Sequence, residues 1–108
     1  MKALTQIILG QRPGNEMVVH PIECMDGTIL SVQASHYHYC WPRNDFGPYE
    51  SMEVGYPTAP PPDSWRKYLD GDPDDDPCSS VYGYVPVELV EEFVALHGGE
   101  KGFTEWPT

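Results

Sequence analysis

The sequence predicts an α+β fold: an antiparallel sheet of four to five strands, with a C-terminal helix packed on one face and a short helix in a Pro-rich crossing. Three observations lead to this prediction. Several short runs alternate apolar and polar residues, one later run has helical periodicity, and 12 prolines and 10 glycines separate the runs with turns. A chain of 108 residues has room for one hydrophobic core, so residues 1–108 are expected to form a single domain.

Residues 3–9 (ALTQIIL) are the first predicted strand, and residues 16–25 (EMVVHPIECM) are the second. Pro21 has no backbone N–H, so the second strand is expected to lie at a sheet edge or to contain a bulge at this point. Asp26-Gly27 then predicts a two-residue turn of the kind that joins antiparallel strands.

This turn fixes the expected register of the hairpin. With two turn residues, Glu23 faces Leu30 and Val19 faces Ala34 across the strand pair. The register gives an apolar face that includes Leu30 and places Cys24 on the opposite side of the sheet. A shift of one residue would exchange the two faces.

The third predicted strand, residues 28–41 (TILSVQASHYHYCW), is the longest in the chain. Its alternation puts His36, His38 and Cys40 on the same face as the aliphatic side chains, and the aromatic side chains on the other face. Pro42 ends the strand because it cannot donate a backbone hydrogen bond.

Residues 49–56 (YESMEVGY) and 80–85 (SVYGYV) are the fourth and fifth predicted strands. Between them, Asp63 or Ser64 is expected to cap a helix of about two turns that follows a run of prolines.

Residues 86–97 (PVELVEEFVALH) predict the C-terminal helix, because Pro86 suits its first position and Gly98-Gly99 follows its last. Its apolar side is expected to face the sheet. The residues of that side are Leu89, Val90, Phe93, Leu96 and His97.

The chain is strongly acidic, with 17 acidic and 6 basic residues and a net charge of −11. Residues 50–108 carry thirteen of the acids and three of the bases, which gives −10. This charge excludes direct binding of nucleic acid or of an anionic membrane through bulk electrostatics, and it attracts basic partners. No apolar run reaches the ~20 residues that span a membrane, and no signal-peptide cleavage pattern follows the N-terminus, so a cytoplasmic location is expected.

Two groups of carboxylates are expected to form one negative surface that occupies a basic, nucleic-acid-binding site on another protein. The residues of this partner-binding surface are Asp70, Asp72, Asp74, Asp75, Asp76, Glu88, Glu91 and Glu92. The spacing Asp70-x-Asp72-x-Asp74 is that of a calcium loop, but Asp75 stands where such a loop needs glycine and Val81 where it needs glutamate. A solvated loop that aids solubility is the alternative interpretation.

A second candidate contact patch is aromatic and consists of Tyr37, Tyr39 and Trp41, with Arg43 beside them. Tyrosine and tryptophan contribute much of the binding energy at protein interfaces. The alternative is a small second core under the Pro-rich crossing. A further function, sequestration of a small signalling ligand, would need a pocket rimmed by Tyr37, Tyr39 and Arg43.

The alternative to an interaction protein is a zinc protein or hydrolase centred on His36, His38 and Cys40, since two imidazoles and a thiolate suit zinc. Side chains at i and i+2 of a strand lie ~7 Å apart, too far to bind one ion without bending. CxxC and HExxH are both missing, as is the motif context that would make Cys40 a nucleophile with His38 as its base. No metal, cofactor or catalytic residue is therefore assigned, and the three cysteines are expected to be reduced thiols.

Three stretches, SVQASHYHYCWPR, GPYESMEVGYP and VYGYVPVELVEEFVALHGG, resemble small proteins encoded by tailed bacteriophages and prophages. The resemblance spans most of residues 28–99. By analogy with anti-CRISPR inhibitors, it implies a phage-encoded interaction protein that inhibits a host defence complex in the host cell cytoplasm.

Overall fold

The structure is a computed structural model, and it describes residues 19–105. These residues form an antiparallel sheet of six strands and one α-helix, α2 (Val87–Leu96), which confirms the α+β class. The strands are β1 (Ile22–Cys24), β2 (Ile29–Gln33), β3 (Ser51–Gly55), β4 (Leu69–Asp70), β5 (Val81–Pro86) and β6 (Glu100–Phe103). Two 3-10 helices, η1 (Asp63–Tyr68) and η2 (Pro77–Ser79), flank β4. The predicted strand 3–9 lies outside the described residues.

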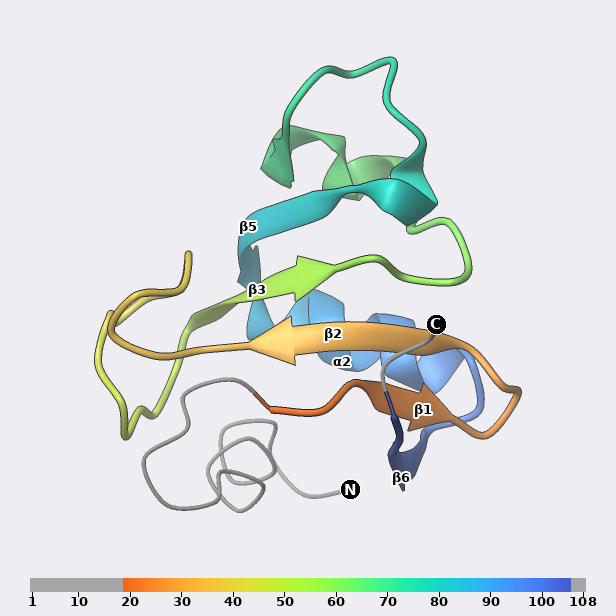
Figure 1. Cartoon of the computed structure of the whole chain (residues 1–108), viewed down its shortest axis with the longest axis horizontal. Helices are drawn as coiled ribbons and strands as arrows, with labels where there is room; N and C mark the ends of the chain where they lie inside the picture. Colours follow the sequence, from red (N-terminus) through yellow and green to blue (C-terminus); the bar gives the residue numbers. More distant parts are fainter. Residues whose placement is uncertain (1–18, 106–108) are drawn as a thin grey trace.

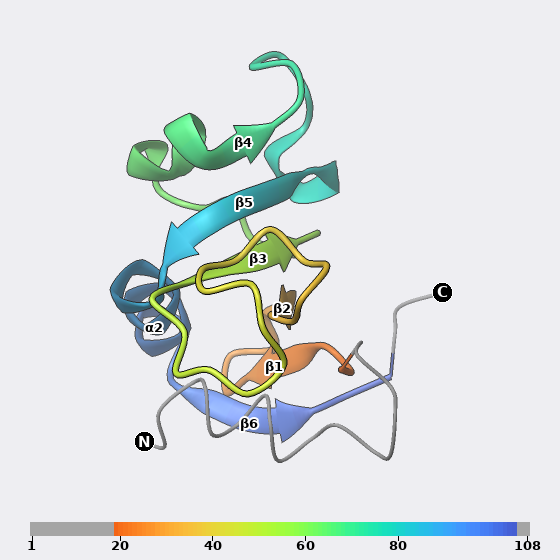
Figure 2. The same cartoon turned by 90° about the vertical axis from the view of Figure 1, so that its left-hand side faces the viewer.

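The strand order in the sheet is β4-β5-β3-β2-β1-β6, and every neighbouring pair is antiparallel. After β5 the chain enters α2, which lies across one face of the sheet and leads to β6 at the far edge (Figures 1 and 2). The sequence did not predict β4 or β6, because β4 has only two residues and β6 (EKGF) lacks an alternating apolar pattern. Within residues 19–105, no helix is long and apolar enough to cross a membrane.

The core lies between α2 and the sheet, and η1 closes it on the β4 side. The indole ring of Trp65 in η1 packs edge-on against the ring of Tyr82 in β5, with 5.7 Å between centroids. The same indole lies 5.4 Å from the ring of Phe93 in α2. One buried tryptophan therefore joins the 3-10 helix, the sheet and the α-helix into one hydrophobic cluster.

The buried side of α2 differs in part from the prediction. Val90, Phe93 and Val94 are buried, whereas the expected core residue Leu96 is 70% exposed. At 3.6 residues per turn, Leu96 lies about 120° around the helix from Val90, beyond the stripe that a flat sheet can cover.

The hairpin register is shifted by one residue from the predicted register, because the turn has three residues. Ile22 pairs with Leu30 and Glu23 with Ile29. The N–H of Cys24 donates to the carbonyl oxygen of Thr28 at 2.7 Å, which closes the turn. The shift moves Cys24 to the buried face.

Three further element boundaries were predicted wrongly. β1 begins only after Pro21 and lies between β2 and β6, with an irregular register between Glu23 and Cys24. The long predicted strand ends at Gln33, and the chain then bends repeatedly through residues 34–50. η1 has Pro62 as its N-cap residue without a side-chain cap, so neither predicted side-chain cap forms.

Candidate binding surface

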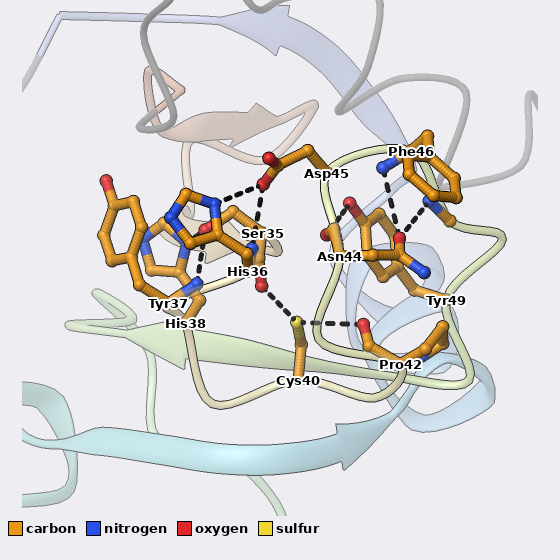
Figure 3. Close-up of polar contacts among 11 residues, drawn as sticks. Ser35, His36, Tyr37, His38, Cys40, Pro42, Asn44, Asp45, Phe46 and Tyr49 are labelled. Atoms are coloured by element: carbon orange, nitrogen blue, oxygen red, sulfur yellow. Dashed lines mark hydrogen bonds and ion pairs between the residues drawn. The ribbon is translucent and has the colours of Figure 1, made fainter.

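Polar side chains hold residues 34–50 as an ordered loop in place of a strand (Figure 3). The hydroxyl oxygen of Ser35 lies 2.6 Å from Nδ1 of His38. The thiol of Cys40 donates to the carbonyl oxygen of Ser35 at 3.2 Å and to that of Pro42 at 3.5 Å. These contacts turn two of the three predicted metal ligands toward the loop's own atoms.

The second half of the loop is fixed in the same way (Figure 3). Asp45 accepts the backbone N–H of His36 on Oδ1 at 2.9 Å, and the same oxygen lies 2.8 Å from Nδ1 of that histidine. The side-chain oxygen of Asn44 accepts the N–H groups of Phe46 and Gly47, at 3.1 and 2.8 Å. Such side-chain to backbone bonds compete with sheet pairing, which explains why the alternating pattern does not continue as a strand.

The loop geometry does not bring the predicted zinc ligands together. His36 is exposed, whereas His38 and Cys40 are buried. Within residues 19–105, no group of three or more His, Cys, Asp or Glu side chains is arranged to hold a metal ion. The strand that would have placed the three residues on one face ends before His36.

The loop instead returns to the sheet at a bulge in β5. Met52 pairs with Val85 and Val54 with Tyr82, so two residues of β5 oppose the single residue between Met52 and Val54 on β3. One of these two residues is Tyr84, which has a left-handed backbone with φ of 56°. This conformation is uncommon for a residue other than glycine, and it turns Tyr84 outward.

Tyr39 of the loop packs on this bulge. Its carbonyl oxygen accepts the N–H of Tyr84 at 2.9 Å, and the two tyrosine rings stack with 6.0 Å between centroids. The backbone of Gly83 lies directly below, since a Cβ there would be 3.2 Å from Cβ of Tyr39. A larger residue at position 83 would therefore push the Tyr39 side chain outward by a few tenths of an ångström.

The bulge and the end of η1 enclose an open groove of about 360 Å³, which we call the tyrosine groove. It is lined by Tyr39, Tyr68, Leu69, Gly83, Tyr84 and the charged Lys67 and Asp70. The ammonium nitrogen of Lys67 lies 5.4 Å from the ring centroid of Tyr68, which is within cation–π range.

The tyrosine groove differs from the pocket expected from the sequence. Tyr39 lines it, but Tyr37 and Arg43 are not among its lining residues. The ring of Tyr37 packs on that of His38 at 4.3 Å, and Trp41 is 58% exposed. The predicted aromatic patch is thus divided, and only Tyr39 contributes to the groove.

The acidic loop, residues 70–76, projects beyond the β4–β5 edge of the sheet (Figures 1 and 2). Its first residue, Asp70, also lines the tyrosine groove. All five of its aspartates are exposed, and within residues 19–105 none of them forms an ion pair. Three of its carboxylates accept nearby backbone N–H groups: Asp72 from Asp74, Asp75 from Asp72, and Asp76 from Cys78. These bonds give the acidic loop a defined shape.

The glutamates of α2 lie apart from the acidic loop. The acidic loop precedes β5 and Glu88 follows it, so the six residues of β5, about 20 Å of extended chain, lie between them. In Figures 1 and 2 the acidic loop is at the sheet edge, whereas α2 is on a sheet face. The expected single negative surface is therefore two separate patches.

A histidine, a carboxylate and a hydroxyl meet where α2 ends at the hairpin. Nδ1 of His97 lies 2.7 Å from Oδ2 of Asp26 and 3.1 Å from the hydroxyl of Thr28. Both partners approach the same ring nitrogen, so the group does not have the geometry of a nucleophile activated by a histidine base. Hydrogen bonds from the N–H of Thr28 and then from His97 lower the pKa of the Asp26 carboxyl.

The three cysteines are thiols without disulfide bonds. Burial, with Asp26 and Glu23 nearby, raises the pKa of the Cys24 thiol to about 11. Burial and then Asp76 also raise the pKa of Cys78. At neutral pH these two thiols are protonated and are poor nucleophiles.

Of the residues that line the groove, Tyr39 and Asp70 were predicted from the sequence to belong to a binding site, and the others were not. The sequence of residues 81–86 (VYGYVP) does not show which side chains are buried, and only the structure shows that Tyr82 and Val85, three positions apart, are both core residues. A regular strand cannot bury both on one face, and the bulge at Gly83-Tyr84 allows it.

Comparisons of the chain with protein-family models, with curated proteins and with solved structures find no match.

Proposed function

We propose that this protein is an interaction protein that binds a basic, nucleic-acid-binding surface of a host protein through the acidic loop. In the same proposal it is encoded by a phage and inhibits a host defence complex, as anti-CRISPR inhibitors do. It acts by occupying the surface that nucleic acid would otherwise contact, and no catalytic step is involved.

The observation that carries the proposal is the exposure of the five aspartates of residues 70–76 on a loop that their own hydrogen bonds shape. Carboxylates held in place lose less conformational entropy on binding than carboxylates on a flexible tail. Duplex DNA presents about one charge per 1.7 Å of helix axis, so closely spaced aspartates suit a surface that binds phosphates.

The exposed aromatic side chains add support. Tyr39 of the 34–50 loop and Tyr84 of β5 are 43 and 46% exposed, and their rings stack with 6.0 Å between centroids. Exposed aromatics grouped on neighbouring segments are typical of protein interaction sites. The acidic loop would supply the electrostatic attraction and these rings the contact area.

The proposal is tested with two variants that carry equal charge changes at opposite ends of β5. One has Asp72, Asp74 and Asp76 changed to lysine, and the matched control has Glu88, Glu91 and Glu92 changed to lysine. Each full-length protein is immobilised, incubated with nuclease-treated bacterial extract and washed, and bound proteins are then displaced with duplex DNA and identified by mass spectrometry.

We expect the wild type and the helix variant to retain a nucleic-acid-binding protein that DNA displaces, and the loop variant to lose it. Retention should also weaken with salt, because exposed charges are screened over ~10 Å at 0.1 M salt. Equal retention by the loop variant, or retention that DNA does not reverse, would show that the acidic loop is not the contact.

A further inference from the structure

We infer that the tyrosine groove is a binding site for a cationic side chain, and that its occupant is an arginine of the basic partner. Two observations point to a cation. Three tyrosine rings and a carboxylate, Asp70, line one open groove beside the acidic loop. A cation already lies over one of these rings, because the ammonium of Lys67 is 5.4 Å from the ring centroid of Tyr68.

The chemistry of the lining explains the preference for arginine. The face of a tyrosine ring is electron-rich and attracts a cation within about 6 Å, and guanidinium groups make this contact more often than ammonium groups. A guanidinium is also planar, so it can lie against a ring while its N–H groups donate to a carboxylate. Tyr84 and Asp70 supply the ring and the carboxylate in the same groove.

The backbone of β5 gives an independent reason to regard the groove as a site. Tyr84 has φ of 56°, in a backbone region that residues other than glycine rarely adopt. The strained residue presents its ring to solvent and to Tyr39, 6.0 Å away, while the hydrophobic core gains nothing from it. The left-handed backbone at the bulge therefore fixes the position of the Tyr84 ring in the groove.

Substitution of Lys67 tests whether the groove binds a cation or an anion. If the groove binds a cation, Lys67 competes with the ligand for the Tyr68 ring and repels it. If the groove binds an anion, Lys67 is the attracting group. Lys67→Gln should therefore tighten the binding of a cationic ligand and weaken that of an anionic one.

The test uses the full chain and a peptide probe, Gly-Arg-Gly-Arg-Gly with blocked ends. The matched probe replaces each arginine with citrulline, which has the same shape and no charge. Binding is measured by NMR from the amide shifts of Leu69 and Gly83, which line the groove. We expect the arginine peptide to shift these amides, and the citrulline peptide to bind at least fivefold more weakly.

Variants of the lining rings locate the site. Tyr84→Leu and Tyr68→Leu should each lower the affinity for the arginine peptide roughly two- to fivefold, the factor expected for one exposed cation–π contact. Tyr84→Phe keeps an aromatic ring and should retain binding. The control is Tyr56→Leu, because Tyr56 is also exposed and also has a positive φ, of 51°, but does not line the groove. Asp70→Asn should weaken binding and Lys67→Gln should tighten it.

Equal binding of the two peptides would overturn the inference, as would unchanged affinity in Tyr84→Leu or weaker affinity in Lys67→Gln. The inference rests on the proposed function only in taking the partner to be basic, and the two can fail separately. If the arginine peptide binds the groove but reversal of the acidic loop leaves the extract partner bound, only the proposed function is wrong. If loop reversal releases the partner but the peptide does not shift Leu69 and Gly83, only the groove assignment is wrong.

Discussion

The core beneath α2 and the exposed β4–β5 edge use tyrosine in opposite ways. Tyr82 is 3% exposed, packs on Trp65 and donates its hydroxyl hydrogen to the carbonyl oxygen of Pro77 at 2.8 Å. Tyr84, two residues later in β5, is 46% exposed and stacks only on another exposed ring, that of Tyr39. The bulge at Gly83-Tyr84 turns Tyr84 away from the core, so Tyr82 stabilises the fold and Tyr84 is available for binding. Substitutions in the two regions should therefore affect different properties.

The largest expected effect comes from removing the buried ring. Tyr82→Ala leaves a cavity beside Trp65 and should lower the free energy of unfolding by about 3–5 kcal/mol. Tyr84→Ala should lower it by less than about 1 kcal/mol, because its ring is exposed and its strained backbone is no worse with alanine. Urea denaturation followed by tryptophan fluorescence gives both values. Similar losses of unfolding free energy in the two variants would mean that Tyr84 contributes to the core as Tyr82 does.

A smaller effect is expected in the loop that carries Tyr39. The side-chain oxygen of Asn44 accepts two backbone N–H groups, so Asn44→Ala should lower the free energy of unfolding by about 1–2 kcal/mol. The same variant should also bind the arginine peptide more weakly, since the loop positions one wall of the groove. The comparison variant is Asn44→Asp, which keeps an accepting oxygen. If Asn44→Asp lowers the free energy of unfolding as much as Asn44→Ala does, the two hydrogen bonds are not the cause.

The smallest effect is expected at Asp26, in the turn that joins β1 to β2. The pKa of Asp26 is lower in the folded protein than in the unfolded chain, so its ionised carboxylate stabilises the fold above the ordinary aspartate pKa of about 4. This contribution is lost as the pH falls through the folded pKa. Asp26→Asn should therefore reduce stability at pH 7 and flatten its decline below pH 4, in thermal unfolding across that range. If the stability of the variant declines below pH 4 as steeply as that of the wild type, Asp26 does not cause the decline.

The same comparison shows what could be predicted from the sequence. The helix at residues 87–96 and the hairpin at Asp26-Gly27 were predictable, because periodicity and turn chemistry are local signals. The register of the hairpin was not, since Asp26-Gly27 also occurs in a three-residue turn and nothing nearby selects between the two lengths. β4 was not predictable either, because a two-residue strand has no period to detect.

The 34–50 segment shows a different limit. Its alternation continued that of β2, but the side chains that alternate there are ones that bond to the backbone, such as Ser35 and Cys40. An alternating pattern predicts a strand only where burial of one face stabilises the strand. The groove is harder still, because Lys67 and Tyr84 are brought together by the pairing of β4 with β5 and by the bulge. Neither feature has a strong local signature.

We propose that the partner binds at the β4–β5 edge and leaves the helix-covered face free. Hydrogen–deuterium exchange of the full chain, alone and with the partner recovered from extract, tests this most directly. We expect slower exchange on binding in residues 67–76 and 83–84, with residues 88–96 unchanged. Slower exchange confined to residues 88–96, with the acidic loop unaffected, would contradict it.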